Sequence, residues 1–433
     1  MTYEETLQYL YASLPVFQHQ GASAYKPGLE TTMSLDGRLG HPHAGYATIH
    51  VAGTNGKGSV CHLLAAILQQ AGYRTGLYTS PHLVDFRERI RVNGKMIPEA
   101  YIRDFVAQHR PFFEPLKPSF FELTSTMAFD YFLKEEVDIA VVETGLGGRL
   151  DSTNIITPIL SIITGISLDH TLLLGGTTVE IAREKAGIIK ESVPVVVGRM
   201  DSPDAEEVFR KRAQELNASL HTPREERVLT HAAYLPKERR WAYESVDYGQ
   251  LSGQLPGLSQ RINAETVLCA LRVLADGGIP IPREAVREGF EQVVRLTGLQ
   301  GRWQEVSSAP YTVCDTGHNA DAWRYLTPQI EAEAEGRPRL YLIIGLSNDK
   351  DIDGILKEMP QKASYLFTQA STARALPAGE LACRAGKAGL TGRACGTVEE
   401  AVRRAMREAG KEDMVFIGGS NFVVAEALPL FST

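Results

Sequence analysis

A lysine set among glycines near the start of the chain has the residue types of a phosphate-binding loop, in the order Gly53-Thr54-Asn55-Gly56-Lys57-Gly58-Ser59. Glycines let the backbone approach an anion closely and direct several N–H groups toward it. The lysine supplies a positive charge for the β- and γ-phosphates, and the hydroxyl of Ser59 is a candidate Mg²⁺ ligand. These residues therefore predict a site for a nucleoside triphosphate with Mg²⁺.

Strand and helix signals on either side of this lysine supply the elements that must position it. An apolar run over residues 48–52 predicts a strand, and leucine and isoleucine then repeat at helical spacing to about residue 71. The N-terminus of that helix adds unpaired N–H groups and the positive end of its dipole. The spacing departs from the usual G-x-x-x-x-G-K-[ST] pattern, because Val51 stands at the first glycine position and Gly58 separates Lys57 from Ser59. A glycine-rich turn with a surface lysine is the alternative.

Three later strands of the same series also end in side chains that suit a phosphate site. In chain order these strands run into Ser80, Glu143 and His170. Ligands of α/β folds bind at the carboxyl ends of the strands, and an acidic residue there commonly faces Mg²⁺ and the attacking nucleophile. The structural alternatives are a Ser-Pro turn, a carboxylate that caps the next loop and a histidine that only packs.

Length and composition restrict the class of protein. A chain of 433 residues predicts two domains, and 43% hydrophobic with 22% charged residues is typical of a globular enzyme. The net charge of −7 argues against a general binder of nucleic acid or anionic membranes. Five scattered cysteines without a C-x-x-C pair indicate reduced thiols, and no signal peptide or long apolar stretch is found. We therefore expect a cytoplasmic protein.

Strand and helix patterns alternate twice along the chain, with a break at the glycines near residues 297–302. Such alternation predicts parallel sheets with helices between the strands. The predicted fold class is α/β, with a P-loop three-layer ATPase domain over residues 1–297 and a smaller Rossmann-like domain over residues 298–433. Residues 200–250 are polar and variable in pattern, and they indicate little about function.

Several separated motifs together resemble one protein family. They are the phosphate loop, the Thr79-Ser80-Pro81-His82 stretch with Glu88-Arg89-Ile90, the glycine-rich loop 143–154 and the segment Glu184-Lys185-Ala186-Gly187-Ile188-Ile189-Lys190. In these motifs the chain resembles folylpolyglutamate synthase/dihydrofolate synthase of the Mur ligase superfamily, and the resemblance extends over nearly the whole chain. The resemblance implies the fold stated above and an ATP-dependent ligase.

The same resemblance implies roles for individual residues. Two Mg²⁺ ions would be held by Ser59, Ser80, Glu143, His170 and Lys185, with Lys185 carbamylated. The catalytic residues would be Lys57, Glu143, His170 and Lys185. ATP would be bound by residues 53–59 of the first domain with Gln260 and Asn263, and from across a cleft by Arg302, Asp315 and His318. The loop through Arg89 would lie near the pterin.

The resemblance also implies the reaction and its small-molecule substrates. L-glutamate would be joined to dihydropteroate, to the γ-carboxylate of folate polyglutamate tails, or to both, through an acyl phosphate. Two rivals remain: a ligase for UDP-linked muramyl precursors, and a P-loop nucleotide switch without ligation. Lys350 is either a contact for an acidic substrate or a solvated loop residue. A monomer without nucleic-acid or membrane partners is expected.

Overall fold

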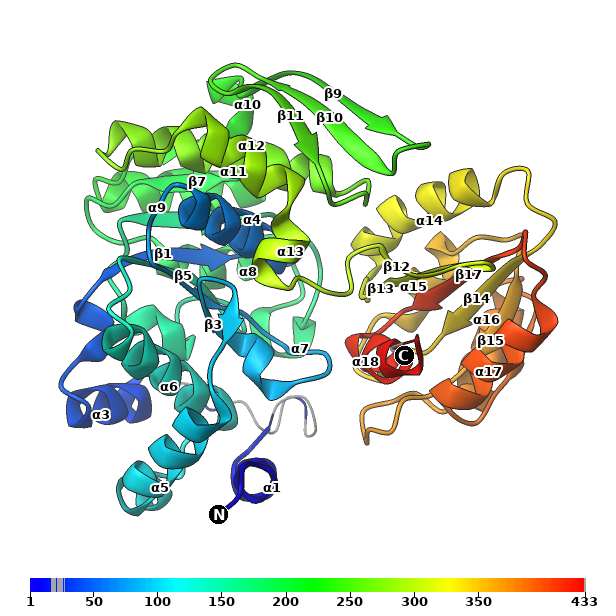
Figure 1. Ribbon diagram of the computed structural model, residues 1–433, viewed down its shortest axis with the longest axis horizontal. Helices are drawn as coiled ribbons and strands as arrows, with labels where there is room; N and C mark the ends of the chain where they lie inside the picture. The colour runs from blue at the N-terminus through cyan, green and yellow to red at the C-terminus, as the bar shows by residue number, and fades with distance from the viewer. Residues whose placement is uncertain (17–20, 22–25, 27, 432–433) are drawn as a thin grey trace.

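The computed structural model describes residues 1–16, 21, 26 and 28–431, and in this range three sheets form (Figure 1). The largest has eight strands in the order β4-β3-β2-β5-β1-β6-β7-β8. Its bounds are β1 Ala47–Ala52, β2 Thr75–Tyr78, β3 Ile90–Val92, β4 Lys95–Met96, β5 Ile139–Glu143, β6 Leu160–Ile163, β7 Val195–Val197 and β8 Leu220–His221. From β2 to β8 neighbouring strands are parallel, while β3 and β4 pair antiparallel at one edge.

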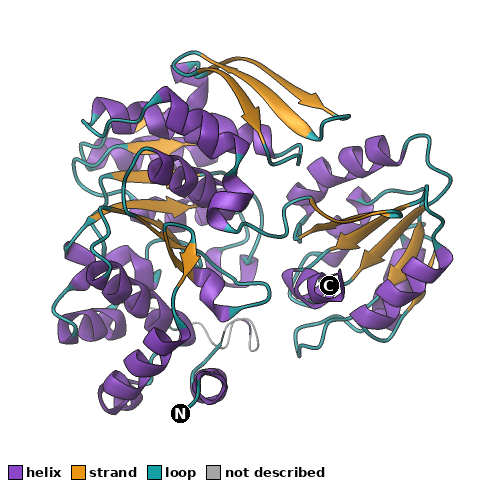
Figure 2. Ribbon diagram, viewed as in Figure 1, coloured by secondary structure: helices purple, strands orange, loops and turns teal. Residues whose placement is uncertain are grey.

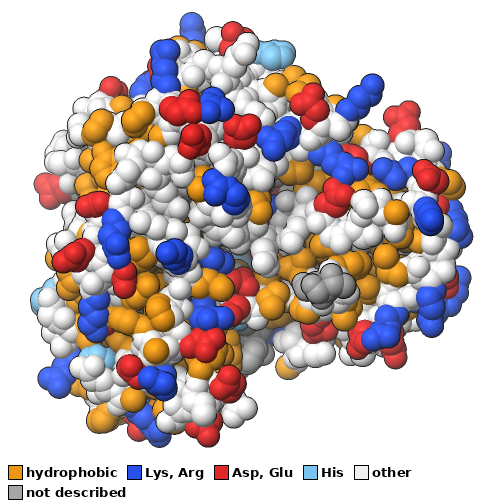
Figure 3. All heavy atoms as spheres, in the orientation of Figure 1, with side chains coloured by type: hydrophobic (Ala, Val, Ile, Leu, Met, Phe, Trp, Pro, Cys, Tyr) orange, Lys and Arg blue, Asp and Glu red, His pale blue; other side chains and the backbone are white. Residues whose placement is uncertain are grey.

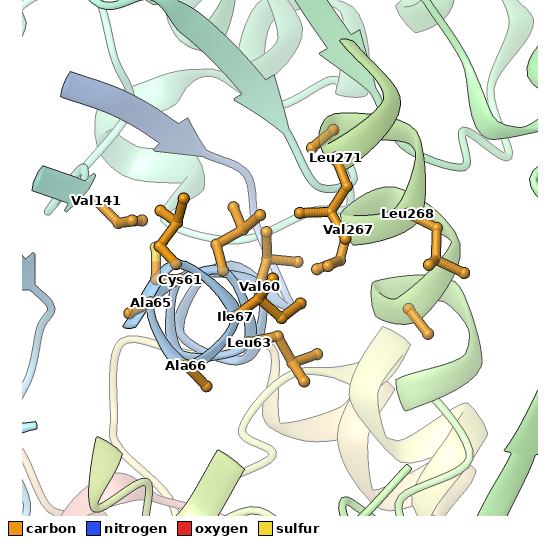
Figure 4. Close-up of a cluster of buried hydrophobic side chains, with 14 of the residues drawn as sticks. Val60, Cys61, Leu63, Ala65, Ala66, Ile67, Val141, Val267, Leu268 and Leu271 are labelled. Carbon is orange, nitrogen blue, oxygen red and sulfur yellow. The ribbon is translucent and has the colours of Figure 1, made fainter. Parts of the chain in front are cut away.

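Helices cover both faces of this sheet, and alternate residues of β5 show why. Ile139 and Val141 pack with α4 (Lys57–Gln70) and α11 (Gln260–Asp276) on one face. Ala140 and Val142 pack on the other face, among side chains of α1, α3, α5 and α6. A strand buried on both faces must be apolar at every position, as β5 is before its final glutamate. Figure 4 shows Val141 facing Cys61 of α4, with Val267 and Leu271 of α11 close by.

The remaining helices of the N-terminal lobe complete its outer layers. Around the sheet lie α1 Tyr3–Ser13, α3 Glu30–Arg38, α5 Glu99–Leu116, α6 Phe120–Lys134, α7 Thr171–Leu174, α8 Thr178–Lys185, α9 Pro203–Glu215, α10 Pro223–Glu226, α12 Arg283–Glu291 and α13 Val293–Thr297. Short 3₁₀ turns are η2 Pro42–Ala44, η3 Phe86–Arg89, η4 Ser152–Ile155 and η5 Ala186–Ile188. The apolar pattern of the sequence predicts a helix over residues 264–275, and α11 begins four residues earlier, at Gln260.

A three-stranded antiparallel sheet lies mostly within residues 200–250, for which the sequence pattern predicts no element (Figure 2). It consists of β9 Leu229–Leu235, β10 Arg240–Ser245 and β11 Gly249–Gly253. Trp241 and Tyr243 from β10 and Leu251 from β11 are buried in the same core as α4 and α11. Along β10 the buried Trp241 and Tyr243 alternate with Arg240, Ala242 and Glu244, which are half-buried or exposed, so this strand packs against the lobe with one face.

The C-terminal domain contains a six-stranded sheet in the order β12-β13-β17-β14-β15-β16. Its elements are β12 Gln304–Ser308, β13 Tyr311–Asp315, α14 Ala320–Ala334, β14 Leu340–Ile344, α15 Ile352–Glu358, β15 Ser364–Phe367, α16 Ala378–Lys387, β16 Gly392–Ala394, α17 Val398–Glu408, β17 Met414–Gly418, α18 Asn421–Ala427 and η6 Leu428–Phe431. Only the β12–β13 pair is antiparallel. The α/β fold class with a P-loop three-layer domain and a smaller second domain is confirmed.

All strands of the first two sheets precede residue 297, and all strands of the third follow residue 303. The exact division at residues 1–297 and 298–433 stays a prediction. No helix in the described part of the chain is both long and apolar enough to cross a membrane. On the face in Figure 3, acidic and basic side chains are interspersed over both lobes, and neither sign forms a broad field.

Candidate active site

A cavity of about 390 Å³ lies between the two lobes and is lined by loops that follow strands of both large sheets. The N-terminal lobe contributes the loops after β1, β2, β5 and β6, and the C-terminal lobe those after β13, β14 and β17. Ligands of α/β folds bind at this end of the strands. All the residues that the sequence analysis assigned to the site line this one cavity.

The loop between β1 and α4 brings the backbone close to its surroundings at two glycines. At Gly53, where φ is 152°, a Cβ atom would come within 1.9 Å of the Thr164 hydroxyl. At Gly56, which precedes α4 with a φ of 87°, a Cβ atom would lie 2.3 Å from the Asn263 side chain. The first turn of α4 follows at once, and its N–H groups have no intrahelical acceptors. The loop therefore offers backbone donors of the kind that bind phosphate.

Lys57 and Glu143 face each other beside this loop. The Lys57 ammonium donates to the carbonyl oxygens of Gly53 at 3.1 Å and Thr54 at 3.2 Å, and it lies 3.9 Å from the Glu143 carboxylate. That carboxylate is buried and accepts a hydrogen bond from the Ser80 N–H at 3.1 Å. Burial raises the pKa of Glu143, while the charge of Lys57 and the Ser80 N–H oppose that rise. A cation, a carboxylate and a serine thus meet where β1, β2 and β5 end.

The start of α11 is hydrogen-bonded to the start of α4. The Gln260 amide donates to the Ser59 hydroxyl at 3.2 Å, and the Asn263 amide donates to the Gln260 oxygen at 2.9 Å. All three side chains are buried. The predicted nucleotide contacts Gln260 and Asn263 therefore lie against the phosphate loop, and Ser59 carries a hydroxyl that is already in a hydrogen-bond chain.

His170 precedes α7 in a left-handed backbone conformation with φ of 51°. Burial lowers the pKa of its imidazole to about 3, so the ring is neutral near pH 7. A neutral imidazole has the lone pair that a metal ion needs. Its Nε2 atom lies 4.0 Å from a carboxylate oxygen of Asp169.

Lys185, at the end of α8, is buried under the phosphate loop. Its amine donates to the carbonyl oxygen of Gly53 at 2.8 Å. Burial, and next the charge of Lys57, lower the pKa of Lys185 to about 7. A large part of this side chain is therefore an uncharged amine near neutral pH, which an exposed lysine is not.

The predicted metal ligands share the cavity without forming a compact group of acids and histidines. Across the described part of the chain, only one set of three His, Cys, Asp or Glu side chains has its ligand atoms within 4.8 Å of one another. That set lies outside the cavity, and none of its members was singled out from the sequence. The metal site expected from Glu143 and His170 depends on hydroxyl, modified lysine, phosphate or water oxygens as further ligands.

The C-terminal domain directs an arginine toward the phosphate loop. The Arg302 guanidinium comes within 3.5 Å of the position that a Cβ atom on Gly58 would occupy. Asp315, at the end of β13, accepts hydrogen bonds from the N–H groups of Trp303 and Gly317, each at 2.8 Å. Asp315 thus fixes the loop that carries Arg302 while lining the cavity itself.

Sequence reasoning missed Asp169, at which side chains of both lobes meet. Its buried carboxylate pairs with Lys350, lies 3.3 Å from His318 Nε2 and accepts a hydrogen bond from Asn319 at 3.3 Å. Burial alone would raise the pKa of Asp169, but the His318 hydrogen bond and the Lys350 charge hold it well below its usual value. Its position next to His170 was the one signal in the sequence.

Two further features of this junction differ from the expectations. The Lys350 side chain is only 9% exposed, so the solvated-loop reading of this residue is wrong. Asn55 of the phosphate loop exchanges hydrogen bonds with Asn319 at 3.0 and 3.1 Å and donates to Asp321 at 2.9 Å. The phosphate loop thus contacts the C-terminal domain directly.

Two family models match the chain along the same division into lobes. The Mur ligase middle domain matches residues 51–271, and the Mur ligase glutamate ligase domain matches residues 301–421. The two matched regions contain the phosphate loop and the Arg302, Asp315 and Lys350 loops respectively. Fold and site together define a Mur ligase.

Curated relatives indicate which kind of Mur ligase the chain is similar to. Dihydrofolate synthase/folylpolyglutamate synthase of Escherichia coli is 34% identical over 402 residues, covering 93% of this chain and 90% of that protein. A probable bifunctional folylpolyglutamate synthase/dihydropteroate synthase of Haloferax volcanii is 33% identical and covers 99% of this chain. The chain spans half the length of that second relative.

Solved structures agree with these relatives. E. coli FolC in complex with DHPP and ADP has a TM-score of 0.84 and 32% identity, covering 99% of this chain and 97% of that one. A bifunctional folylpolyglutamate synthase/dihydrofolate synthase with Mn, AMPPNP and L-glutamate bound has a TM-score of 0.82 and 31% identity, covering 99% and 98%. The chain belongs to the folylpolyglutamate synthase/dihydrofolate synthase family of ATP-dependent ligases.

Proposed function

We propose that this chain joins L-glutamate to dihydropteroate and to the γ-carboxylate of (tetrahydro)folate polyglutamate tails, using ATP, in folate biosynthesis. The observation that carries this proposal is the single cavity into which the phosphate loop and the strand-end loops of the second domain both open. Two reactants and a nucleotide can meet there away from bulk water. The relatives that combine both synthase activities support the bifunctional form.

The reaction needs ATP because a carboxylate anion is a poor acceptor for an amine. A carboxylate oxygen of the pterin substrate attacks the γ-phosphorus, the bond to the β-phosphate oxygen breaks, and ADP leaves. The resulting acyl phosphate is attacked by the glutamate amine, which loses a proton. The C–O bond to phosphate then breaks, so inorganic phosphate leaves with one oxygen of the original carboxylate.

The chain's own residues stabilise the charge that moves during phosphoryl transfer. The N–H groups at residues 53–59 and the Lys57 ammonium bind the phosphates. Gln260 donates a hydrogen bond to Ser59 at the end of this loop, and Asn263 donates one to Gln260. Arg302, Asp315 and His318 contact ATP from the second lobe in this proposal. The pairing of Asp169 with Lys350 and His318 supports closure of the lobes around the reactants.

The residues of the cavity fit a divalent metal. The buried carboxyl group of Glu143, a neutral imidazole at His170 and the hydroxyls of Ser59 and Ser80 are groups that can bind a divalent metal. When bound, Mg²⁺ neutralises phosphate charge and helps to orient the reacting groups. We assign two ions to this set together with Lys185.

Carbamylation of Lys185 is part of this assignment. The uncharged amine attacks carbon dioxide and loses a proton. The product is an oxygen-bearing anion, whereas an ordinary lysine is a cation. Burial and the lowered pKa of Lys185 support the reaction, since only the free amine is a nucleophile. Its contact with Gly53 supports a place next to the phosphates.

The remaining proposals concern organisation. We propose domains at residues 1–297 and 298–433, a monomer, and a cytoplasmic location. Five cysteines without a disulfide among the described residues support a reducing compartment.

A single assay tests the ligation and separates it from the rivals. ADP release is measured with dihydropteroate, tetrahydrofolate or a UDP-muramyl acceptor, each with and without L-glutamate, and the products are weighed by mass spectrometry. Release that requires a pterin acid and glutamate, with an adduct one glutamate heavier, supports the proposal. ADP release at the same rate with and without glutamate would identify a nucleotide switch. Equal turnover of the UDP-muramyl acceptor would overturn the folate assignment.

A further inference from the structure

A second cluster of ligand side chains lies on the N-terminal lobe, outside the cavity. Asp36 on the last turns of α3 accepts a hydrogen bond from Nδ1 of His41 on one carboxylate oxygen and from Nδ1 of His43 on the other, each at 2.7 Å. This is the one group in the described chain whose three ligand atoms lie within 4.8 Å of one another. Figure 1 shows α3 beside α6, on the side of the lobe opposite the C-terminal domain.

The backbone holds these three side chains together. The His41 N–H donates to the carbonyl oxygen of Asp36 at 3.0 Å, and His41 has a φ of 59°, which is uncommon for a residue other than glycine. Pro42 then begins the turn η2, which carries His43 and leads into β1. The His43 ring rests 6.3 Å from the Phe129 ring of α6. The fold thus fixes the backbone of His41 and the ring of His43 next to Asp36.

Asp36 is the buried member of this cluster, and His41 is the exposed one. The Asp36 side chain is 3% exposed, His43 19% and His41 66%. Burial alone would raise the pKa of Asp36, but the hydrogen bonds from His43 and His41 keep it below its usual value. A buried carboxylate thus lies between two imidazoles, one of which is open to solvent.

We propose that Asp36, His41 and His43 form a binding site for one divalent cation of the Zn²⁺ class, with a ring nitrogen from each histidine and a carboxylate oxygen as protein ligands. Two imidazoles with one carboxylate suit Zn²⁺, Ni²⁺ or Cu²⁺, whereas Mg²⁺ prefers a ligand set made mainly of oxygen atoms. Water on the exposed side of His41 completes the coordination. Where the metal binds Nδ1 of an imidazole, the ring proton lies on Nε2.

The consequence of binding is structural. The ion would tie the end of α3 to the turn that immediately precedes β1, the strand that ends at the phosphate loop. Its ligands lie outside the cavity, so this site is independent of the proposed ligation and of the Mg²⁺ ions assigned to it.

Calorimetric titration of the full chain with Zn²⁺, in buffer with excess Mg²⁺, tests the proposal. His41→Gln is the deciding variant, because this exposed side chain can be replaced without opening the core. His43→Gln follows, and His231→Gln is the matched control because it alters an exposed histidine on β9. We expect the wild type and the control to bind one Zn²⁺ more than either cluster variant, or to bind it on the order of tenfold more tightly.

Two further readouts accompany the titration. Co²⁺ in place of Zn²⁺ should give visible absorption bands in the wild type that disappear in His41→Gln, while ligation with Mg²⁺-ATP is unchanged in that variant. Zn²⁺ should raise the melting temperature of the wild type more than that of the variants. Equal Zn²⁺ stoichiometry and affinity in wild type and both cluster variants would overturn the assignment.

Discussion

Carbamylation of Lys185 should follow directly from the free amine that its surroundings create. With a pKa of about 7, roughly half of Lys185 is uncharged at pH 7, whereas a lysine of ordinary pKa is uncharged in about one molecule in 2,500. The reactive fraction is therefore about three orders of magnitude larger than for a surface lysine. It rises as the pH increases through about 7, because the group then loses its proton.

The assay is carbon-13 NMR of the full chain in ¹³C-bicarbonate, with ligation measured in the same buffer. The wild type should show one carbamate signal that grows between pH 6 and pH 8. Lys185→Arg should lack it, since a guanidinium does not form a carbamate, and its turnover should fall on the order of 100-fold or more through loss of the metal ligand. Lys211→Arg, which alters an exposed lysine on α9, is the control. It should keep the carbamate signal and the turnover of the wild type.

Two results would refute the reasoning. One is a carbamate signal of equal size in the wild type and in Lys185→Arg. The other is full activity of the wild type in buffer stripped of carbon dioxide, with no carbamate detected at Lys185.

Four further substitutions probe the site from both lobes. Lys57→Ala should reduce turnover on the order of 100-fold or more without changing the melting temperature greatly; retained turnover would remove Lys57 from phosphoryl transfer. Arg302→Ala should chiefly raise the KM for ATP, and an unchanged ATP dependence would contradict its assignment. Asp169→Asn and Lys350→Met should each slow ligation, and the double variant should be no slower than the worse single one, because both remove one buried pair. Additive losses would show that the two residues act separately.

Much of the fold could be predicted because its signals are local. The apolar run of β5 that ends in Glu143 is readable from the sequence, and the strand is buried on both faces as its composition requires. The phosphate loop is equally clear, since its three glycines and its lysine all lie within residues 53–59. These features depend on residues close together in the chain.

The missed parts depend on distant residues or on mixed patterns. Asp169 and Lys350 are 181 positions apart, and only the meeting of two domains gives each its partner. The β9–β11 sheet is not evident from the sequence because β9 has His231, Ala233 and Leu235 on one face and so lacks a clear alternation of polar and apolar residues. The start of α11 at Gln260 is not evident from the apolar pattern because the buried positions of its first turn are the amides Gln260 and Asn263.

Transfer of an oxygen atom from substrate to phosphate tests the central claim most directly. Dihydropteroate labelled with ¹⁸O in its carboxylate is incubated with ATP, L-glutamate and the full chain, and the inorganic phosphate is analysed by mass spectrometry or ³¹P NMR. An acyl phosphate route predicts one ¹⁸O atom in the phosphate for each amide formed. Amide formation with unlabelled phosphate would contradict the proposed reaction.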